Sequence, residues 1–174
     1  RQAFARLPQG SAASRRGTTH ISVDDGRGQV VAMTLSNGEG NGYVLPGTGI
    51  VLNNMLGEED INRCGFHGWP TNRRLASMMA PTILQRRDQR WLLGSGGSNR
   101  IRTTLAQVIC RLVDFDQTLD AAIDAPRLHL EQGRLAIENP AGAWSSASLA
   151  WLSAHYPDAR RWPGYNLYFG GVHA

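Results

Sequence analysis

The stretch Gly17-Thr18-Thr19-His20-Ile21-Ser22-Val23-Asp24 decides the interpretation of this chain. A small residue precedes two hydroxyl residues, and a strand-like run follows them. If the Gly17–Thr18 peptide bond is cut, the freed α-amine of Thr18 can act as the base for its own hydroxyl. An α-amine titrates at about pH 7.7–8.0, so a useful fraction is neutral near pH 7. The stretch therefore predicts a threonine nucleophile, although two threonines entering a strand are also ordinary β-formers.

The same hydroxyl can make the cut by attacking the Gly17 carbonyl, which forms an ester that water opens. Glycine helps because it has no side chain to block the attack. Residues 1–17 are rich in Ser, Ala, Gly, Gln and Arg and are predicted to be a linker, with the ordered domain at residues 18–174. The chain has neither an initiator Met nor a signal-type apolar segment at its start, so we expect it to be part of a longer product.

Composition narrows the class of protein. At 174 residues and 41% hydrophobic, the chain can bury a core as one domain, and no apolar run is long enough to span a bilayer. All 18 basic residues are dispersed arginines without interleaved aromatic residues, so we expect no nucleic-acid partner. Cys64 and Cys110 form neither a metal motif nor a disulfide framework. A single disulfide between them is the alternative to two free thiols. Four histidines lack the sequence spacing that is typical of metal ligands: His67, His129, His155 and His173.

Hydrophobic periodicity predicts alternating strands and helices. Apolar residues at a spacing of 3.6 predict a helix over about 101–113, and shorter helices are expected at 117–124 and 145–155. Strands are expected at 20–24, 29–36, 81–85, 90–93, 128–130, 134–137 and 166–172. Strands, then helices, then strands are typical of a layered α+β sandwich.

A glycine-rich turn, Gly94-Ser95-Gly96-Gly97-Ser98, connects a predicted strand to the long helix. Such a turn presents backbone N–H groups and the positive end of the helix dipole to an anion or a developing oxyanion. A phosphate site of the Walker type would require a lysine, and the chain has none. The alternative is a simple helix cap by Ser98.

Polar residues in the preceding loops are further candidates. Glu58 follows Gly57, and its carboxylate is suited to a substrate ammonium, although acidic residues here are also typical of a solvated loop. Asn37, Asn53 and Asn54 stand in the same region and are candidates with Glu58. We expect strand alternation to turn His20 away from the nucleophile and to give it a structural role.

Together these stretches resemble the small subunit of the γ-glutamyltransferases (γ-glutamyltranspeptidases), which are N-terminal-nucleophile hydrolases. The resemblance runs in the family's order over roughly residues 17–130. It is carried by residues 17–23, by Pro46-Gly47-Thr48-Gly49-Ile50-Val51-Leu52-Asn53-Asn54, by Ala76-Ser77-Met78-Met79-Ala80-Pro81-Thr82, by Gly94-Ser95-Gly96-Gly97-Ser98-Asn99-Arg100-Ile101 and by Ala125-Pro126-Arg127.

The resemblance implies a four-layer αββα sandwich, made as a precursor that cleaves itself before Thr18 and pairs with a large subunit. It implies acyl transfer from glutathione or a similar γ-glutamyl amide to water or an amino acid, without a metal or organic cofactor, in the periplasm or outside the cell. The catalytic residues implied are Thr18 as nucleophile, Thr19 or Ser36 as support for its amine, and Gly96 and Gly97 as the oxyanion-hole pair. The substrate-binding residues implied are Asn37 and Glu58 at the α-amino group, Ser77 at the α-carboxylate, and Ser98.

Two departures from the family pattern affect the substrate site. The family's Ser-Ser-Met is Ala76-Ser77-Met78 here, so one carboxylate ligand is missing. The glycine turn lacks the proline of the family's Gly-Ser-Pro-Gly-Gly, so it can be aligned with the family pattern in two ways that differ by one residue. Two alternatives therefore remain: an acylase of the same fold acting on another amide, such as a β-lactam side chain, and an unprocessed relative without catalytic activity.

Overall fold

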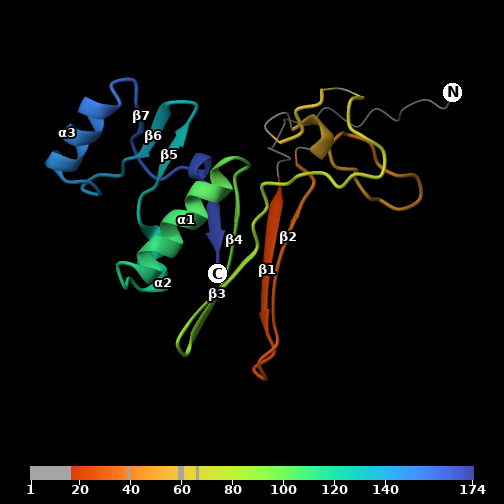
Figure 1. Cartoon of the computed structure of the whole chain (residues 1–174), viewed down its shortest axis with the longest axis horizontal. Coiled ribbons are helices and arrows are strands. Elements are labelled where there is room, and N and C mark those ends of the chain that lie inside the picture. Colours follow the sequence, from red (N-terminus) through yellow and green to blue (C-terminus); the bar gives the residue numbers. More distant parts are fainter. Residues whose placement is uncertain (1–16, 39, 59–60, 66) are drawn as a thin grey trace.

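Two β-sheets packed face to face form the centre of the fold (Figure 1). The computed structural model describes residues 17–38, 40–58, 61–65 and 67–174, so most of the predicted linker lies outside the described residues. Strands β1 (Thr18–Asp24) and β2 (Val30–Ser36) form an antiparallel hairpin. The second sheet has the order β3 (Thr82–Arg86), β4 (Gln89–Gly96) and β8 (Gly171–His173).

The hairpin lies against β4 through one face of β1. Thr18 lies over Gly96, the ring of His20 lies over Gly94, and the Ser22 hydroxyl donates a hydrogen bond of 3.3 Å to the carbonyl of Leu92. Residues two positions apart in a strand share a face. The expectation that His20 points away from Thr18 is therefore wrong, although the packing of its ring against Gly94 agrees with a structural role.

Helices α1 (Arg100–Val113) and α2 (Leu119–Asp124) lie beside the second sheet, so that β4 lies between α1 and the hairpin. The predicted helical period is confirmed, because the buried side chains of α1 recur at Ile101, Leu105, Val108 and Leu112 and pack with Leu93. Burying one such side chain contributes about 1.5–3 kcal/mol. Among the described residues, no helix covers the outer face of β1 and β2.

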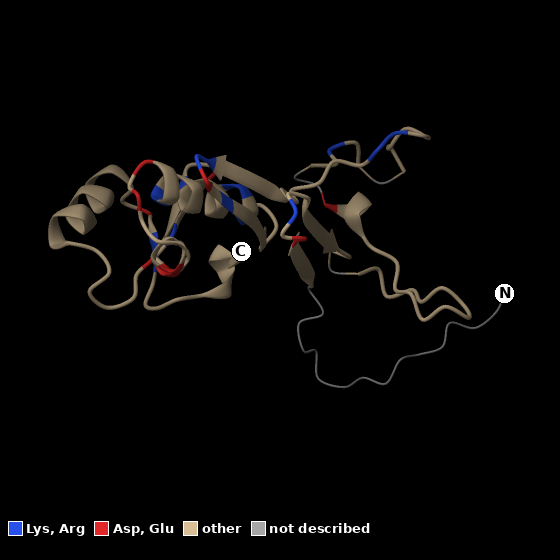
Figure 2. Cartoon of the chain, turned by 90° about the horizontal axis from the view of Figure 1, so that it is seen from below, with Lys and Arg blue, Asp and Glu red and all other residues tan. Residues whose placement is uncertain are grey.

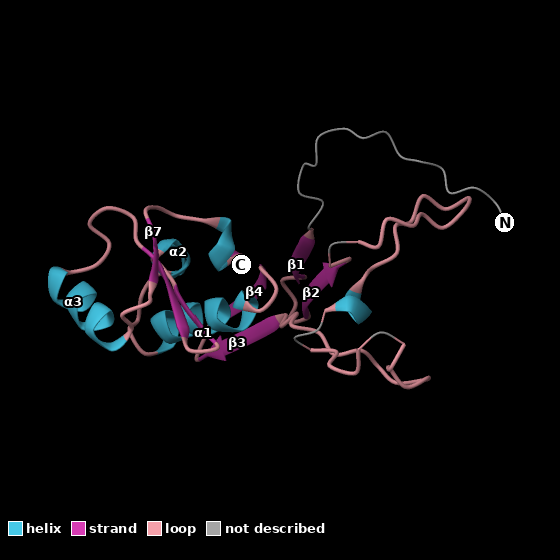
Figure 3. Ribbon diagram, turned by 90° about the horizontal axis from the view of Figure 1, so that it is seen from above, coloured by secondary structure: helices cyan, strands magenta, loops and turns pink. Residues whose placement is uncertain are grey.

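A third sheet forms a second lobe with helix α3 (Ser146–His155), as Figure 3 shows. Its strands are β5 (Leu128–Glu131), β6 (Arg134–Glu138) and β7 (Arg160–Trp162), of which β7 pairs in parallel with β6. Leu135, Ile137 and Leu152 form its core. The short strand β7 was not predicted from the sequence.

The predicted final strand over residues 166–172 is wrong in its first half. A 3-10 helix, η2 (Leu167–Phe169), stands there, and β8 begins only at Gly171. The Asn166 side chain accepts a hydrogen bond from the Tyr168 N–H and caps this turn. Gly170 then takes a φ of 81°, which separates the turn from the strand.

Figure 2 shows arginines and acidic residues in both halves of the described fold rather than gathered on opposite faces. Cys64 and Cys110 are both exposed and are not paired with each other. No helix in the described ranges has the length and apolarity to cross a membrane.

Candidate active site

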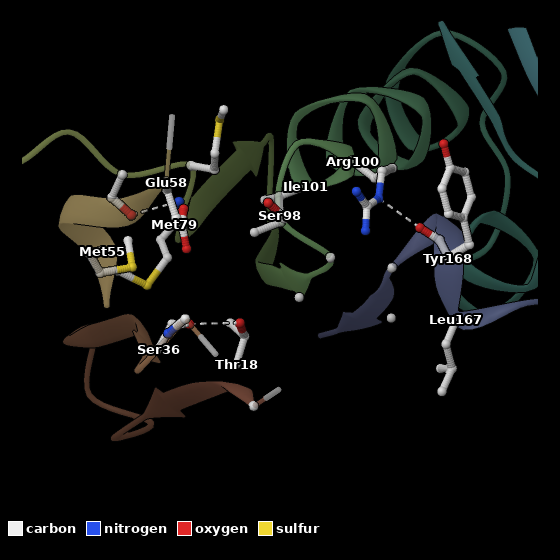
Figure 4. Close-up of a pocket in the computed structure, with 18 of the residues that line it drawn as sticks. Thr18, Ser36, Met55, Glu58, Met79, Ser98, Arg100, Ile101, Leu167 and Tyr168 are labelled. Carbon is white, nitrogen blue, oxygen red and sulfur yellow. Dashed lines mark hydrogen bonds between the residues drawn. The ribbon is translucent and has the colours of Figure 1, made fainter. Parts of the chain in front are cut away.

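A pocket of about 750 Å³ opens beside the start of β1, between the hairpin, the glycine turn and η2 (Figure 4). This volume is within the range of small-molecule sites. Most of the side chains and backbone groups expected at a catalytic site line it, although they come from five separate segments. These residues are Thr18, Ser36, Glu58, Ser77, Gly96, Gly97 and Ser98.

Thr18 lies at the floor of the pocket and is held by its strand partner. Its hydroxyl donates a hydrogen bond of 3.1 Å to the Ser36 hydroxyl, and the two residues face each other in the β1–β2 register. The Ser36 oxygen also accepts a 3.0 Å bond from the Gly38 N–H. A Cβ at Gly96 would lie 3.3 Å from the Cβ of Thr18, so a glycine lets β4 approach Thr18 closely.

Two predicted site residues do not line the pocket. Thr19 is exposed, and strand alternation turns its side chain to the face opposite Thr18. Asn37 contributes its carbonyl to the local backbone, where it accepts bonds from the Gly40 and Asn54 N–H groups at 2.9 and 3.3 Å. Asn54 lines the pocket in its place.

One wall of the pocket is polar and carries a carboxylate. Asn54 and Glu58 flank the 3-10 turn η1 (Met55–Gly57) and lie next to Gly38, which has a φ of +60°. A Cβ at Gly38 would overlap the Asn54 side chain and lie 3.0 Å from a Glu58 carboxylate oxygen. Glycine at this position therefore lets the loop close over both side chains. Ser77 also lines the pocket, and its hydroxyl accepts a 3.0 Å bond from the Met79 N–H.

The glycine turn forms the roof opposite Thr18. Gly97 has a φ of +121° and Ser98 a φ of 52°, so the backbone turns sharply before α1 begins. The carbonyls of Gly97 and Ser98 accept from the N–H groups of Arg100 and Ile101. Ser98 is not the helix cap: Asn99 holds that position without a side-chain cap bond. The first two N–H groups of α1 are thus paired within the turn itself.

A second wall of the pocket was missed from the sequence. Arg100 donates from Nε to the Tyr168 carbonyl at 2.9 Å, and its guanidinium carbon lies 4.8 Å from the centre of the Tyr168 ring. Leu167 and Asn166 complete this wall. Arg100 was not identified from the sequence, because its place in this wall depends on Tyr168, which is distant in sequence.

Buried hydrogen bonds hold Gly170 against the roof. Arg127 donates to the Gly170 carbonyl at 3.2 Å, and Thr104 donates to the Phe169 carbonyl at 2.6 Å. A Cβ at Gly97 would lie 2.9 Å from the Gly170 Cα, so the two backbones are in direct contact. This explains why Arg127 is buried although it lies outside the pocket.

His20 supports the site from beneath. Its Nδ1 lies 2.7 Å from the Thr34 hydroxyl, and its ring is buried. Burial, followed by the nearby His173, lowers the pKa of His20 below its usual 6.5. Burial within the sheet packing therefore favours the neutral form of the ring. No cluster of three or more His, Cys, Asp or Glu that could hold a metal occurs in the described part of the chain.

Comparison with known proteins agrees with this geometry. The family model described as Gamma-glutamyltranspeptidase matches residues 2–162. The glutathione hydrolase proenzyme of Escherichia coli K12 is 36% identical over 125 residues, which cover 64% of this chain and 22% of that protein. The acylase ACY 1 proenzyme of Pseudomonas sp. SE83 is 33% identical over 124 residues, which cover 70% of this chain and 22% of that protein. This chain thus spans about a fifth of the length of these curated relatives.

A mutant of Helicobacter pylori gamma-glutamyltranspeptidase has a similar solved structure. It superposes with a TM-score of 0.70 at 27% identity, and the match covers 88% of each chain. The α+β sandwich of N-terminal-nucleophile hydrolase type is thereby confirmed as the fold. With the family match over residues 2–162, this chain belongs to the gamma-glutamyltranspeptidase family.

Proposed function

We propose that this chain is the catalytic small-subunit region of an enzyme that transfers or hydrolyses γ-glutamyl groups, with Thr18 as nucleophile. The observation that carries the proposal is the position of Thr18, whose hydroxyl lies on the pocket floor beneath the turn of Gly97 and Ser98. A nucleophile facing backbone N–H donors across a small-molecule pocket is the arrangement that acyl transfer requires.

The first step is cleavage before Thr18, within a precursor that also supplies a large subunit. The Thr18 Oγ attacks the Gly17 carbonyl carbon, the Gly17–Thr18 C–N bond breaks, and the Thr18 nitrogen takes up the proton. Water then hydrolyses the ester and leaves a free α-amine on Thr18. The bond from Thr18 to Ser36 orients the hydroxyl for this attack while the peptide is still intact.

The second step is acylation by substrate. The α-amine of Thr18 takes the proton from Oγ as Oγ attacks the γ-carbonyl carbon of a γ-glutamyl amide such as glutathione. The amine then gives this proton to the departing nitrogen, and a γ-glutamyl ester of Thr18 remains. Water or an amino acid then attacks the ester and passes a proton to the α-amine, which returns it to Oγ as the C–Oγ bond breaks, so that the Thr18 hydroxyl and the free amine are restored. Glu58 accepts the substrate ammonium, with Asn54 beside it, and Ser77 contributes to the site of the α-carboxylate.

The oxyanion donors are assigned to the backbone N–H groups of Gly97 and Ser98, one residue later than the expected pair. Arg86 and Gln89 face each other across the two-residue turn between β3 and β4. Along an antiparallel strand, the backbone N–H and C=O groups of successive residues point alternately to one neighbouring strand and to the other. If those of Gln89 point to β3, those of Gly96, seven residues later, point to the other side, toward its partner Gly171 in β8. The N–H of Gly96 is then used by the sheet, and the next two N–H groups serve the oxyanion.

The test uses the precursor with its large-subunit region present. Intact mass and N-terminal sequencing over time should reveal a fragment that begins at Thr18, and this fragment should be absent from Thr18→Ala. The processed enzyme should then release nitroaniline from a γ-glutamyl anilide. A chain that stays uncleaved under native conditions would contradict the proposal and favour a non-catalytic relative.

An acylase acting on another amide is the second candidate, because Ala76 replaces a serine of the family pattern and an acylase is among the relatives. A glutaryl anilide, which lacks the α-ammonium, distinguishes the two. Faster turnover of the glutaryl than of the γ-glutamyl compound would favour the acylase.

A further inference from the structure

We propose that Arg100 binds the carboxylate of the peptide on the amine side of the scissile bond, both as leaving group and as acceptor. This inference rests on the proposed function, because it assigns the part of the pocket that the γ-glutamyl group leaves open.

The pocket has two chemically different walls on either side of Thr18. Glu58, Met79 and Met55 lie on one side, and Arg100, Tyr168 and Leu167 lie on the other (Figure 4). During the reaction, the γ-carbonyl carbon of the substrate lies at Thr18. The rest of the γ-glutamyl group extends from this carbon in one direction, and the leaving or attacking amine lies in the other. If the acyl ammonium lies at Glu58, the amine lies toward Arg100.

Arg100 is fixed in place with most of its donors uncommitted. The Tyr168 carbonyl takes only the Nε proton, and the Tyr168 ring supports the guanidinium. The terminal nitrogens extend into the open part of the pocket (Figure 4). None of the ion pairs between described residues involves Arg100. It is also the one arginine among the described residues that line the pocket.

A carboxylate is the ligand that this arrangement fits. The two terminal nitrogens of a guanidinium match the two oxygens of a carboxylate, and the pair forms charge-assisted hydrogen bonds. Amino acids and short peptides carry such a carboxylate, whether they leave or attack. Water carries none, so Arg100 favours transfer to peptides over hydrolysis.

The experiment uses the processed two-subunit enzyme and pairs of compounds that differ only in this carboxylate. With a γ-glutamyl anilide as donor, glycylglycine is compared with glycylglycinamide as acceptor. With no acceptor added, glutathione is compared with its glycine amide as donor, which tests the leaving group separately. Wild type should prefer each free acid by about tenfold or more in kcat/KM. Arg100→Gln should lose this preference, and Arg100→Lys should keep part of it.

Arg102→Gln is the matched control, because Arg102 is an exposed arginine on the same helix outside the pocket. It should retain the preference. If Arg100→Gln does not fold, the acid-to-amide ratio of wild type and its decrease with added salt still test the inference. Equal use of acid and amide by wild type, or a preference that survives in Arg100→Gln, would overturn it. An enzyme that releases no nitroaniline at all would instead refute the γ-glutamyl activity itself.

Discussion

The hydroxyl of Thr18 donates to the hydroxyl of Ser36 across the first pair of the β1–β2 hairpin, with 3.1 Å between the oxygens. The proposed nucleophile is thus oriented by its strand partner, and the Gly38 N–H fixes that partner in turn.

Ser36→Ala should slow self-cleavage without abolishing it. One hydrogen bond between neutral groups contributes about 0.5–1.5 kcal/mol, which corresponds to roughly a twofold to tenfold change in rate. The measurement is the disappearance of the precursor band with time. Ser22→Ala is the control, because Ser22 stands on the same face of β1 but bonds the Leu92 carbonyl instead. Equal cleavage rates in wild type and Ser36→Ala would show that the contact has no role in processing.

Gly94→Ala should destabilise the sheet packing, because a Cβ at this position would overlap the His20 ring. Inserting one carbon into a packed interior typically costs about 1–3 kcal/mol. For a domain of this size, the melting temperature should fall by about 2–4 °C for each kcal/mol. Gly164→Ala is the control, since a Cβ there would meet no atom within 4 Å. Equal melting temperatures for the two variants would contradict the face-to-face packing of β1 on β4.

His20 should make the stability of the protein depend on pH. Its pKa in the folded state is lowered from 6.5 by burial and then by His173, so the unfolded chain binds more protons at acid pH. The contribution of His20 to stability is therefore complete above about pH 6.5 and is lost as the pH falls through the lowered folded pKa. The difference between the urea midpoints of wild type and His20→Gln should be smallest at acid pH and largest above about pH 6.5. The exposed His155 provides the control substitution, and parallel midpoint curves for wild type and His20→Gln would refute the prediction.

The sequence was most informative where a pattern is local. The spacing of Ile101, Leu105, Val108 and Leu112 predicted α1, and the hydroxyl-rich start of β1 led to the proposal that Thr18 is the nucleophile. Strand β7 could not be predicted in this way, because three residues acquire strand geometry only by pairing with β6.

The residues of the pocket were harder to predict, because the pocket is assembled from segments that are distant in sequence. Asn37 and Asn54 look equivalent in a glycine-rich loop, and only the folded loop shows that Asn54 reaches the pocket while Asn37 uses its carbonyl for the backbone. Arg100 gave no signal of its own, since its position depends on Tyr168, which is 68 residues away in sequence.

Glu58→Gln should impair recognition of the substrate ammonium. A hydrogen bond to a charged partner contributes about 1.5–3 kcal/mol, so KM for a γ-glutamyl anilide should rise by roughly tenfold to hundredfold. The glutaryl anilide has no ammonium, and its kinetics should change much less. Asp88→Asn, in the exposed β3–β4 turn, controls for the loss of one negative charge. Equal losses on both anilides would show that Glu58 acts on something other than the ammonium.

Ser98 separates a backbone role from a side-chain role at the oxyanion site. Its φ of 52° lies in the left-handed region, which costs a residue with a Cβ about 1–2 kcal/mol and costs glycine little. Ser98→Gly keeps the backbone N–H, removes the hydroxyl and relieves this strain, so the melting temperature should rise while kcat falls by less than about threefold. Ser98→Val also keeps the N–H, but a β-branched residue opposes the left-handed backbone, so kcat should fall by about tenfold or more. If Ser98→Gly instead raises KM as strongly as Ser98→Val lowers kcat, the hydroxyl itself binds the substrate, and the donor pair must be sought elsewhere on the turn.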